Sequence, residues 1–341
     1  MTTVPQAPTA PFGTVFAGAM SVVRWDNGSW EAPTVGPVEP FSFHPATHVL
    51  HYASACFEGL KAHRGTDGRV RIFRLEAHVR RMQRSAEILM LPVPSAETLS
   101  AMIVDVVRAN IDEVPAAPGS LYLRPTLIGT EENIGAAGVP SKQAMLYVLA
   151  SPVGDYFAGG IRPLKIAIET STPRTTPQFG MVKSGANYVM ALGPTMKAKK
   201  DLGADQMLFA PAGHVQETGA ANFMMIDSDR VITPALSEAF LHGVTRDSML
   251  ALAADMGYRV EERDDLTVDE VLEWAARPGA EAALSGTAAV LASVGSFLHM
   301  GEDLPVGTGE VGSNTLKLRS ALTDIHIGER PDPYGWLTEV S

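Results

Sequence analysis

Strand-like and helix-like segments follow one another in an irregular order along this chain. Alternating apolar residues predict strands at residues 15–25, 60–64, 69–73, 120–128, 143–151, 164–169, 206–209, 222–226, 258–262 and 282–294. Apolar residues spaced three and four apart predict helices at 75–89, 96–111, 188–201, 245–256, 268–276 and 315–325. A regular alternation would favour one wound parallel sheet, whereas this irregular order predicts an α/β fold of the α+β type.

A segment rich in proline and glycine divides the chain. Residues 151–163 contain two prolines and three glycines, a composition typical of a linker between domains. We therefore expect a smaller N-terminal α/β domain at 1–150, an interdomain loop at 151–163 and a larger C-terminal domain at 164–341. A length of 341 residues suits two domains that each bury a core.

Composition limits the partners that this chain can have. The net charge is −11, with 45% apolar and 19% charged residues, so the average field would repel nucleic acid and anionic membranes. No apolar run reaches the ~18 residues of a membrane span, and residues 1–15 lack the pattern of a signal peptide. The single cysteine, Cys56, excludes a disulfide within the chain, and we expect a cytoplasmic protein.

Lys183 lies among small residues, just before a predicted helix, in the segment 179–188. A lysine that loses its proton can form a Schiff base with a carbonyl compound, and small neighbours let a flat ring approach the backbone. The alternative is an ordinary solvated lysine in a loop. The segment alone does not decide between the two.

A carboxylate, Glu217, lies between two predicted strands beside small residues. A buried glutamate is costly unless it meets a cation, and a protonated pyridine nitrogen is such a cation. The alternative is a surface glutamate at the edge of a turn.

Two glycine–threonine units have the composition of phosphate-binding turns. Gly243-Val244-Thr245 precedes a predicted helix, whose first backbone N–H groups can bind phosphate. Gly286-Thr287-Ala288 would add a second turn with a hydroxyl donor. Ordinary helix capping is the alternative explanation.

Two arginines lie on predicted strands beside aromatic residues. Alternation places Arg71 on the same face as Phe73, and Arg124 on the same face as Tyr122. Such arginines suit carboxylate or phosphate binding, although an exposed strand face explains them equally well.

Two other patterns are not interpreted as sites. Three histidines have helix-like spacing, but a proline interrupts them and no carboxylate follows nearby, so we expect no metal site at His44, His48 and His51. Four arginines of one predicted helix are interpreted as a solvated face and not as a nucleic-acid site: Arg74, Arg80, Arg81 and Arg84.

Together these segments resemble the branched-chain aminotransferases, class IV aminotransferases of pyridoxal 5′-phosphate (PLP) fold type IV. The similarity runs from Phe12 to Ile325, and its blocks occur in the family order. The blocks are residues 51–53, 57–61, 121–126, 128–131, 151–157, 183–188, 217–222, 243–246 and 285–288. The resemblance implies the two-domain architecture of that fold type.

The resemblance also implies roles for the matching residues. Lys183 would bind PLP covalently and carry a proton between the substrate Cα and the cofactor, while Glu217 would pair with the pyridinium nitrogen and Tyr188 would bind the ring oxygen. The PLP phosphate would be held by Arg71, Val244, Thr245 and Thr287. The substrate would be contacted by Phe16, Tyr52, Phe57, Tyr122, Arg124, Tyr156, Arg174, Thr287 and Ala288.

The implied reaction is a reversible ping-pong transfer of the amino group of leucine, isoleucine or valine to 2-oxoglutarate, which gives branched-chain 2-oxo acids and glutamate. One pocket must then accept an aliphatic side chain and a carboxylate, so we expect an apolar aromatic lining with Arg124 at its edge. The resemblance also implies a homodimer, in which the loop of Tyr52 crosses the interface. Ala220 replaces a frequent family threonine, and Ala289 and Ala292 replace a redox-active cysteine pair of some animal members.

Three alternatives remain open at this point. A D-amino acid aminotransferase and an aminodeoxychorismate lyase share the fold, but both are generally shorter and lack the long block at 122–131. A non-catalytic protein that binds phosphate or carboxylate ligands is the alternative from another class. Such a binder needs no Schiff-base lysine, so the combination of Lys183, Tyr188 and Glu217 argues against it.

Overall fold

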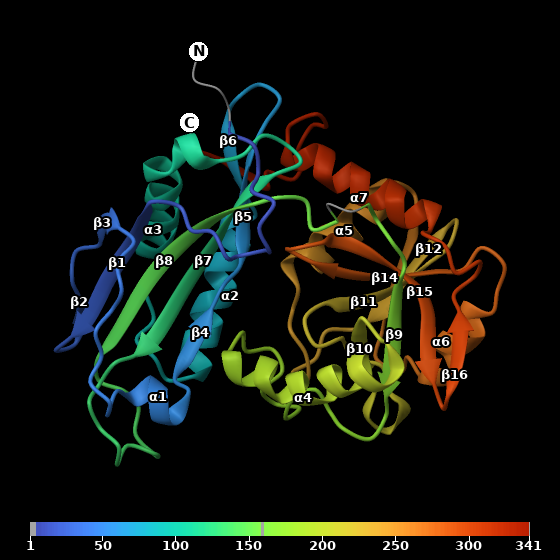
Figure 1. The fold of residues 1–341 in the computed structure, drawn as a ribbon, viewed down its shortest axis with the longest axis horizontal. Coiled ribbons are helices and arrows are strands. Elements are labelled where there is room, and N and C mark those ends of the chain that lie inside the picture. Colours follow the sequence, from blue (N-terminus) through green and yellow to red (C-terminus); the bar gives the residue numbers. More distant parts are fainter. Residues whose placement is uncertain (1–4, 158–159, 341) are drawn as a thin grey trace. The chain divides into compact units, whose positions relative to one another are not determined.

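The computed structural model describes residues 5–157 and 160–340, which form two compact units (Figure 1). The first unit extends to Tyr156 and also includes Val182–Gly185 and the chain from Asp324 onward. The second unit comprises Phe157–Met181 and Ala186–Thr323. The boundary at Tyr156 falls within the predicted linker, of which residues 158–159 lie outside the described part of the chain.

Two segments assigned to the second domain by sequence belong to the first unit. The C-terminal residues Leu337–Glu339 pair with a strand of the first unit, and the Lys183 carbonyl accepts a hydrogen bond from the Phe57 amide at 3.0 Å. The two units therefore depart from the expected blocks 1–150 and 164–341 at these two segments, because contacts distant in sequence return them to the first unit.

An antiparallel sheet forms the centre of the first unit. Its strands are β1 (Ala19–Asp26), β2 (Ser29–Trp30), β3 (Thr34–Pro37), β4 (Ala55–Phe57), β5 (Leu60–Arg64), β6 (Val70–Phe73), β7 (Ser120–Gly129), β8 (Ala144–Val153) and β17 (Leu337–Glu339). Their order is β17-β6-β5-β7-β8-β1-β2, while β3 pairs with β1 and β4 with β7. β7 and β8 pair from Ser120 opposite Val153 to Gly129 opposite Ala144, which makes them the longest hydrogen-bonded pair of this sheet.

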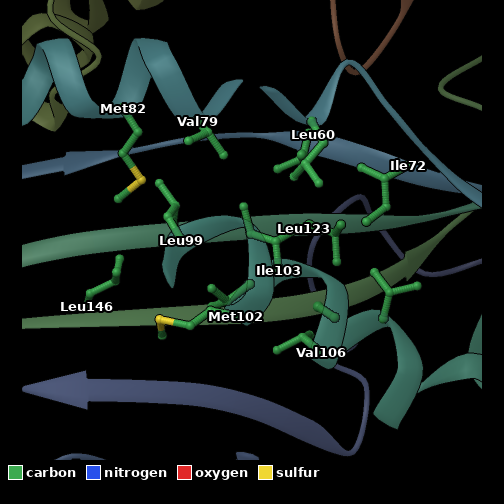
Figure 2. Close-up of a cluster of buried hydrophobic side chains, with 14 of the residues drawn as sticks. Leu60, Ile72, Val79, Met82, Leu99, Met102, Ile103, Val106, Leu123 and Leu146 are labelled. Atoms are coloured by element: carbon green, nitrogen blue, oxygen red, sulfur yellow. The ribbon is translucent and has the colours of Figure 1, made fainter. Parts of the chain in front are cut away.

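Two amphipathic helices cover this sheet. The helical segments of the first unit are α1 (His48–Tyr52), α2 (Leu75–Ile88), α3 (Ala96–Ala109) and a short 3₁₀ turn at Ile111–Glu113. Met82 of α2 and Leu99 of α3 are fully buried with Leu123 of β7 in one cluster (Figure 2). Burying each such side chain contributes about 1.5–3 kcal/mol, so this packing fixes α2 against the strands that carry site residues.

A mixed sheet forms the centre of the second unit. Its strands are β9 (Leu164–Glu169), β10 (Gln206–Phe209), β11 (Asn222–Ile226), β12 (Arg230–Pro234), β13 (Arg259–Arg263), β14 (Glu281–Gly286), β15 (Val290–His299) and β16 (Glu302–Pro305). Their order is β10-β9-β15-β14-β11-β12-β13, with β16 beside β15. Every residue of β11 is buried, so the polar site residues lie where these strands end.

Four helices accompany this sheet: α4 (Gly185–Leu202), α5 (Val244–Asp255), α6 (Val268–Ala275) and α7 (Ser313–His326), with a 3₁₀ turn at Pro211–Gly213. A capping box starts α6, because Thr267 Oγ1 accepts from the Glu270 amide while Glu270 Oε2 accepts from the Thr267 amide. By contrast, the N-cap residue of α5 is Gly243, which has no side chain that could cap the first turn.

Most of the predicted elements are confirmed, with ends shifted by a few residues. The hairpin of β5 and β6 has Ala62 opposite Ile72. The strand predicted at 282–294 is wrong: β14 and β15 are two antiparallel strands, with Thr287 in the turn between them. The uniformly apolar composition on both sides of this turn conceals it in the sequence, because both strands are buried.

The structure also bears on the histidines considered above. His48 Nδ1 lies 2.8 Å from Ser54 Oγ, and His51 Nε2 lies 2.8 Å from the Pro45 carbonyl. Within residues 5–157 and 160–340, no three or more histidine, cysteine or acidic side chains form a group suited to a metal ion. In the same ranges, no helix has the length and apolarity needed to cross a bilayer.

Candidate active site

Lys183 is a half-buried residue of the first unit, and both its backbone N–H and its backbone carbonyl form hydrogen bonds. Its amide donates to Ser85 Oγ of α2 at 3.1 Å, and its carbonyl accepts from the Phe57 amide at 3.0 Å. Its Nζ lies 5.1 Å from the centre of the Phe57 ring. The two hydrogen bonds hold the backbone of Lys183 in place. A fixed backbone helps to orient the amine of a lysine that forms a Schiff base.

A buried charged network lies next to this lysine in the first unit. Glu58 Oε1 accepts from Arg81 Nε at 2.7 Å, and its Oε2 accepts from Arg81 Nη2 at 2.8 Å and lies 2.7 Å from His78 Nδ1. Burial alone would raise the pKa of the Glu58 carboxyl, but the charge of Arg81 and the hydrogen bonds hold that pKa well below its ordinary value. Burial lowers the pKa of His78, against the opposing effect of the Glu58 charge.

This network corrects one sequence interpretation. The sequence pattern places Arg81 on a solvated helix face, but its side chain is only 10% exposed and pairs with the 1% exposed Glu58. His78, Arg81 and Ser85 are spaced three and four apart, so they share one side of α2. That spacing of polar residues beside a buried apolar stripe is the signal in the sequence that could have identified the network.

A cavity of about 450 Å³ lies within the first unit. Its wall is largely aromatic: Phe12, Phe16, Phe57, Tyr122 and Tyr147. Arg124 is the only charged residue among the described residues that line it. The expected combination of an apolar wall and one arginine is therefore present, and three further predicted residues, Phe16, Phe57 and Tyr122, line the same cavity as Arg124.

The Arg124 guanidinium is packed between two rings of this cavity. Its Cζ lies 4.5 Å from the centre of the Phe57 ring and 5.3 Å from that of Tyr122, and Nη2 donates to the Tyr122 hydroxyl at 2.8 Å. The buried Nε has no hydrogen-bond partner among the described residues. A buried donor without a partner is costly, so a ligand with an acceptor atom would be stabilised at this point.

Glycine is required at position 59 beside this cavity. A Cβ atom there would overlap the Tyr122 hydroxyl, which the bond from Arg124 holds in place. The absence of a side chain at Gly59 therefore allows the Tyr122 ring to reach its position next to Arg124.

In the second unit, the Glu217 carboxylate is 2% exposed and contacts three donors. Its Oε1 accepts from the Leu241 amide at 3.0 Å and lies 2.7 Å from Arg174 Nη1. Its Oε2 accepts from Asn222 Nδ2 at 3.1 Å. Such contacts favour the ionised carboxylate, the form that pairs with a protonated ring nitrogen.

Arg174, which is predicted to contact the substrate, lies in the second unit. Its side chain is 2% exposed and lies against Glu217, with Cζ 5.5 Å from the centre of the Tyr188 ring. The carboxylate attracts the guanidinium into the interior of the second unit. The sequence around Arg174 does not predict its contact with Glu217, because Glu217 is 43 residues away in the chain.

The predicted phosphate-binding turns lie beside Glu217 in the second unit. Asn222 Nδ2 also donates to the Leu241 carbonyl at 2.9 Å, and a Cβ atom at Gly243 would overlap Asn222 Oδ1. Ser285 pairs opposite Asn222, and a Cβ at Gly286 would lie 3.8 Å from the Ala220 carbonyl. The start of α5, with Val244 and Thr245, and the turn with Thr287 and Ala288 therefore lie near the same carboxylate.

Three further predicted residues belong to the first unit. Arg71 donates to both carboxylate oxygens of Asp67, at 3.1 and 2.5 Å, on the β5–β6 turn. Tyr52 donates its hydroxyl to the Ile134 carbonyl. Tyr156 is 53% exposed and, like Tyr52, is not among the residues lining the cavity.

The family profile for amino-transferase class IV matches residues 55–297. This chain belongs to the class IV aminotransferase family. A probable branched-chain-amino-acid aminotransferase of Streptomyces coelicolor is 37% identical over 338 residues, which cover 96% of this class IV aminotransferase and 91% of the relative. Branched-chain-amino-acid transaminase 1 of Bacillus subtilis is 35% identical over 98% of this chain and 96% of its own length.

Solved structures agree with this assignment. The T.th. branched-chain amino acid aminotransferase with pyridoxamine 5′-phosphate has a TM-score of 0.77 and 30% identity, covering 96% of this chain and 100% of its own. The same enzyme complexed with N-(5′-phosphopyridoxyl)-L-glutamate has a TM-score of 0.75 and 29% identity, over the same shares of the two chains. These similarities confirm the family and the fold class predicted from the sequence.

Proposed function

We propose that this class IV aminotransferase transfers the amino group of leucine, isoleucine or valine to 2-oxoglutarate. The observation that carries the proposal is the aromatic cavity with Arg124 as its one charged lining residue among those described. An aliphatic side chain fits the apolar wall, while the second carboxylate of glutamate or 2-oxoglutarate meets the buried Arg124 Nε. The relatives and solved structures named above carry the same activity in their names.

The residues of the second unit suit PLP. The Glu217 carboxylate would pair with the pyridinium nitrogen. Arg174 contacts both this carboxylate and the ring of Tyr188. The N-terminus of α5, with Val244 and Thr245, offers backbone N–H groups to a phosphate, and Thr287 adds a hydroxyl. When bound, PLP supplies an electron sink for the electrons released at the substrate Cα.

In the first unit, Lys183 would bind PLP through its amine and then move the proton at the substrate Cα. Arg71 remains a proposed phosphate contact, and we add Arg81 to it. Arg81 lies one turn before Ser85 on α2, and Ser85 Oγ accepts a hydrogen bond from the Lys183 amide. Thr287 and Ala288 would seat the substrate α-carboxylate.

A homodimer is part of the proposal. Three apolar side chains three and four residues apart on α4 are exposed by more than half of their area: Val189 by 70%, Leu192 by 55% and Met196 by 52%. A contiguous apolar stripe of this kind is usually covered by a partner, and a second copy of the chain would do so. A cytoplasmic location is also proposed, supported by the single free cysteine.

The test is a transamination assay with 2-oxoglutarate and either L-leucine or D-alanine. We expect a yellow protein that uses L-leucine, and a Lys183→Ala variant without turnover. The visible absorbance should change when L-leucine is added to wild type alone. A preference for D-alanine, or a fully active Lys183→Ala protein, would contradict the proposal.

A further inference from the structure

We infer that Arg174 is a positioning residue that clamps Glu217 and Tyr188, the two side chains that the proposed function places at the pyridine ring. This inference rests on the proposed function, since it specifies how the ring-binding groups of that site are held. Arg174 would not touch the substrate side chain.

The contact with Glu217 is an ion pair buried on both sides. Arg174 Nη1 lies 2.7 Å from Glu217 Oε1, and each side chain is 2% exposed. Arg174 Nε also donates to the carbonyl of Gly219 at 3.3 Å. One planar guanidinium therefore holds both the carboxylate and the turn that follows it, a geometry that lysine cannot reproduce.

The same guanidinium reaches Tyr188. Its Cζ lies 5.5 Å from the centre of the tyrosine ring, within the ~6 Å range of a cation–π contact. The adjacent residue Thr175 donates to Asn187 Oδ1 at 2.7 Å, and Asn187 Nδ2 donates to the Phe179 carbonyl at 2.9 Å. Thr175 follows Arg174 and Asn187 precedes Tyr188, so these hydrogen bonds also hold the chain next to each of the two residues.

The clamp has an electrostatic consequence as well as a geometric one. A buried positive charge beside Glu217 offsets part of the negative charge that this carboxylate presents to a protonated ring nitrogen. Loss of the Arg174 charge therefore favours protonated forms of the bound chromophore. A residue that serves only to fill space would have no such effect on a pKa.

The first experiment titrates the visible absorbance of the PLP-loaded protein against pH. Arg174→Met should raise the pKa of the chromophore by about one unit. Arg174→Lys keeps a positive charge and should leave that pKa near the wild-type value, although its PLP affinity should fall because the fork geometry is lost. Equal pKa values in wild type and Arg174→Met would overturn the inference, as would equal upward shifts in both variants.

The second experiment measures the melting temperature of the PLP-free protein. Arg174→Met and Glu217→Gln should each lower it by several degrees, since each leaves one buried group without its partner. The double variant should regain much of that loss, whereas additive losses would show that the pair is not coupled. This measurement needs no PLP, so it decides the clamp even if the protein fails to bind PLP and the proposed function is wrong.

Discussion

Arg80 and Arg81 are neighbours on α2 with opposite environments. Arg80 is 67% exposed and lies 3.4 Å from the Oε2 atom of Glu76, one turn earlier, while Arg81 is 10% exposed and binds both oxygens of the buried Glu58. An exposed pair contributes about 0–1 kcal/mol. Removal of one partner from a buried pair costs about 3–5 kcal/mol, because a charge remains buried without compensation.

We therefore expect Arg81→Met to lower the free energy of unfolding by about 3–5 kcal/mol, and Arg80→Met, its matched control, to change it by less than about 0.5 kcal/mol. Urea denaturation of the PLP-free proteins measures both values. The pKa of Glu58 is held below its ordinary value of 4.5, so the pair stabilises fully above that pH. Its contribution is lost as pH falls through the lowered folded-state pKa, and the difference between wild type and Arg81→Met should shrink there.

A double variant, Glu58→Gln with Arg81→Met, separates stability from cofactor binding. It should recover much of the lost stability, because no charge remains buried. Its affinity for PLP should stay reduced if Arg81 contacts the phosphate. Wild-type affinity in the double variant would argue against the phosphate role and leave Arg81 a structural residue.

Periodicity predicts the long elements of this fold because their apolar faces are buried in a regular pattern. β7, β8, α2 and α3 all appear within a few residues of their predicted bounds. The return of Val182–Gly185 and of β17 to the first unit is not predicted. These short segments are held by contacts with residues far away in the chain, and the local sequence pattern cannot predict such contacts.

Site residues divide in the same way. Lys183, Glu217 and Arg124 are recognisable from family motifs, and the structure gives Glu217 and Arg124 buried charged or polar partners. The burial of Arg81 and the partner of Arg174 are not predicted from sequence, because both depend on carboxylates that are distant in the chain. An arginine beside a predicted helix or loop has the same local pattern whether it meets water or a buried glutamate.

Gly243 and Gly193 should respond to the same substitution with opposite signs. A Cβ at Gly243 would overlap Asn222, which is fixed by Glu217 and the Leu241 carbonyl. A Cβ at Gly193 within α4 would meet no described atom within 4 Å beyond its chain neighbours and the backbone of its own helix. We expect Gly243→Ala to destabilise by about 1–3 kcal/mol and to weaken PLP binding. Gly193→Ala should stabilise by about 0.5–1 kcal/mol.

These values follow from thermal or urea unfolding combined with a fluorescence titration of PLP. Wild-type PLP affinity in Gly243→Ala would mean that the start of α5 does not hold the cofactor. A destabilised Gly193→Ala protein would mean that position 193 lies against a partner copy, which the dimer proposal would then have to accommodate.

Arg124→Ala should impair glutamate more than leucine as the amino donor. A lost charge-assisted hydrogen bond costs about 1.5–3 kcal/mol, which corresponds to a change of about tenfold or more in the ratio of the two kcat/KM values. Tyr122→Phe removes only the hydroxyl that accepts from Arg124, so its effect should be smaller and in the same direction. An unchanged ratio in Arg124→Ala would reject the carboxylate role.

Cys56 should be inert toward thiol reagents in the folded protein. Its side chain is fully buried, and burial together with the charge of Glu58 raises the pKa of its thiol to about 12. The thiolate is the reactive form, so almost none is present at neutral pH. A thiol-reactive dye should label no cysteine in the native protein and one after denaturation, since the chain contains a single cysteine.

Mild peroxide should therefore reduce the activity of wild type and of Cys56→Ala by the same small fraction. Ala289 and Ala292 carry no thiol, so Cys56 is the one residue of this chain at which peroxide could form a sulfenic acid. Peroxide also oxidises exposed methionines such as Met300 and Met90, which are 89% and 65% exposed, and any loss from this cause should be the same in both proteins. A rapid loss of activity in wild type alone, reversed by a reductant, would instead mean that the site opens often enough to expose Cys56 and that this thiol regulates the enzyme.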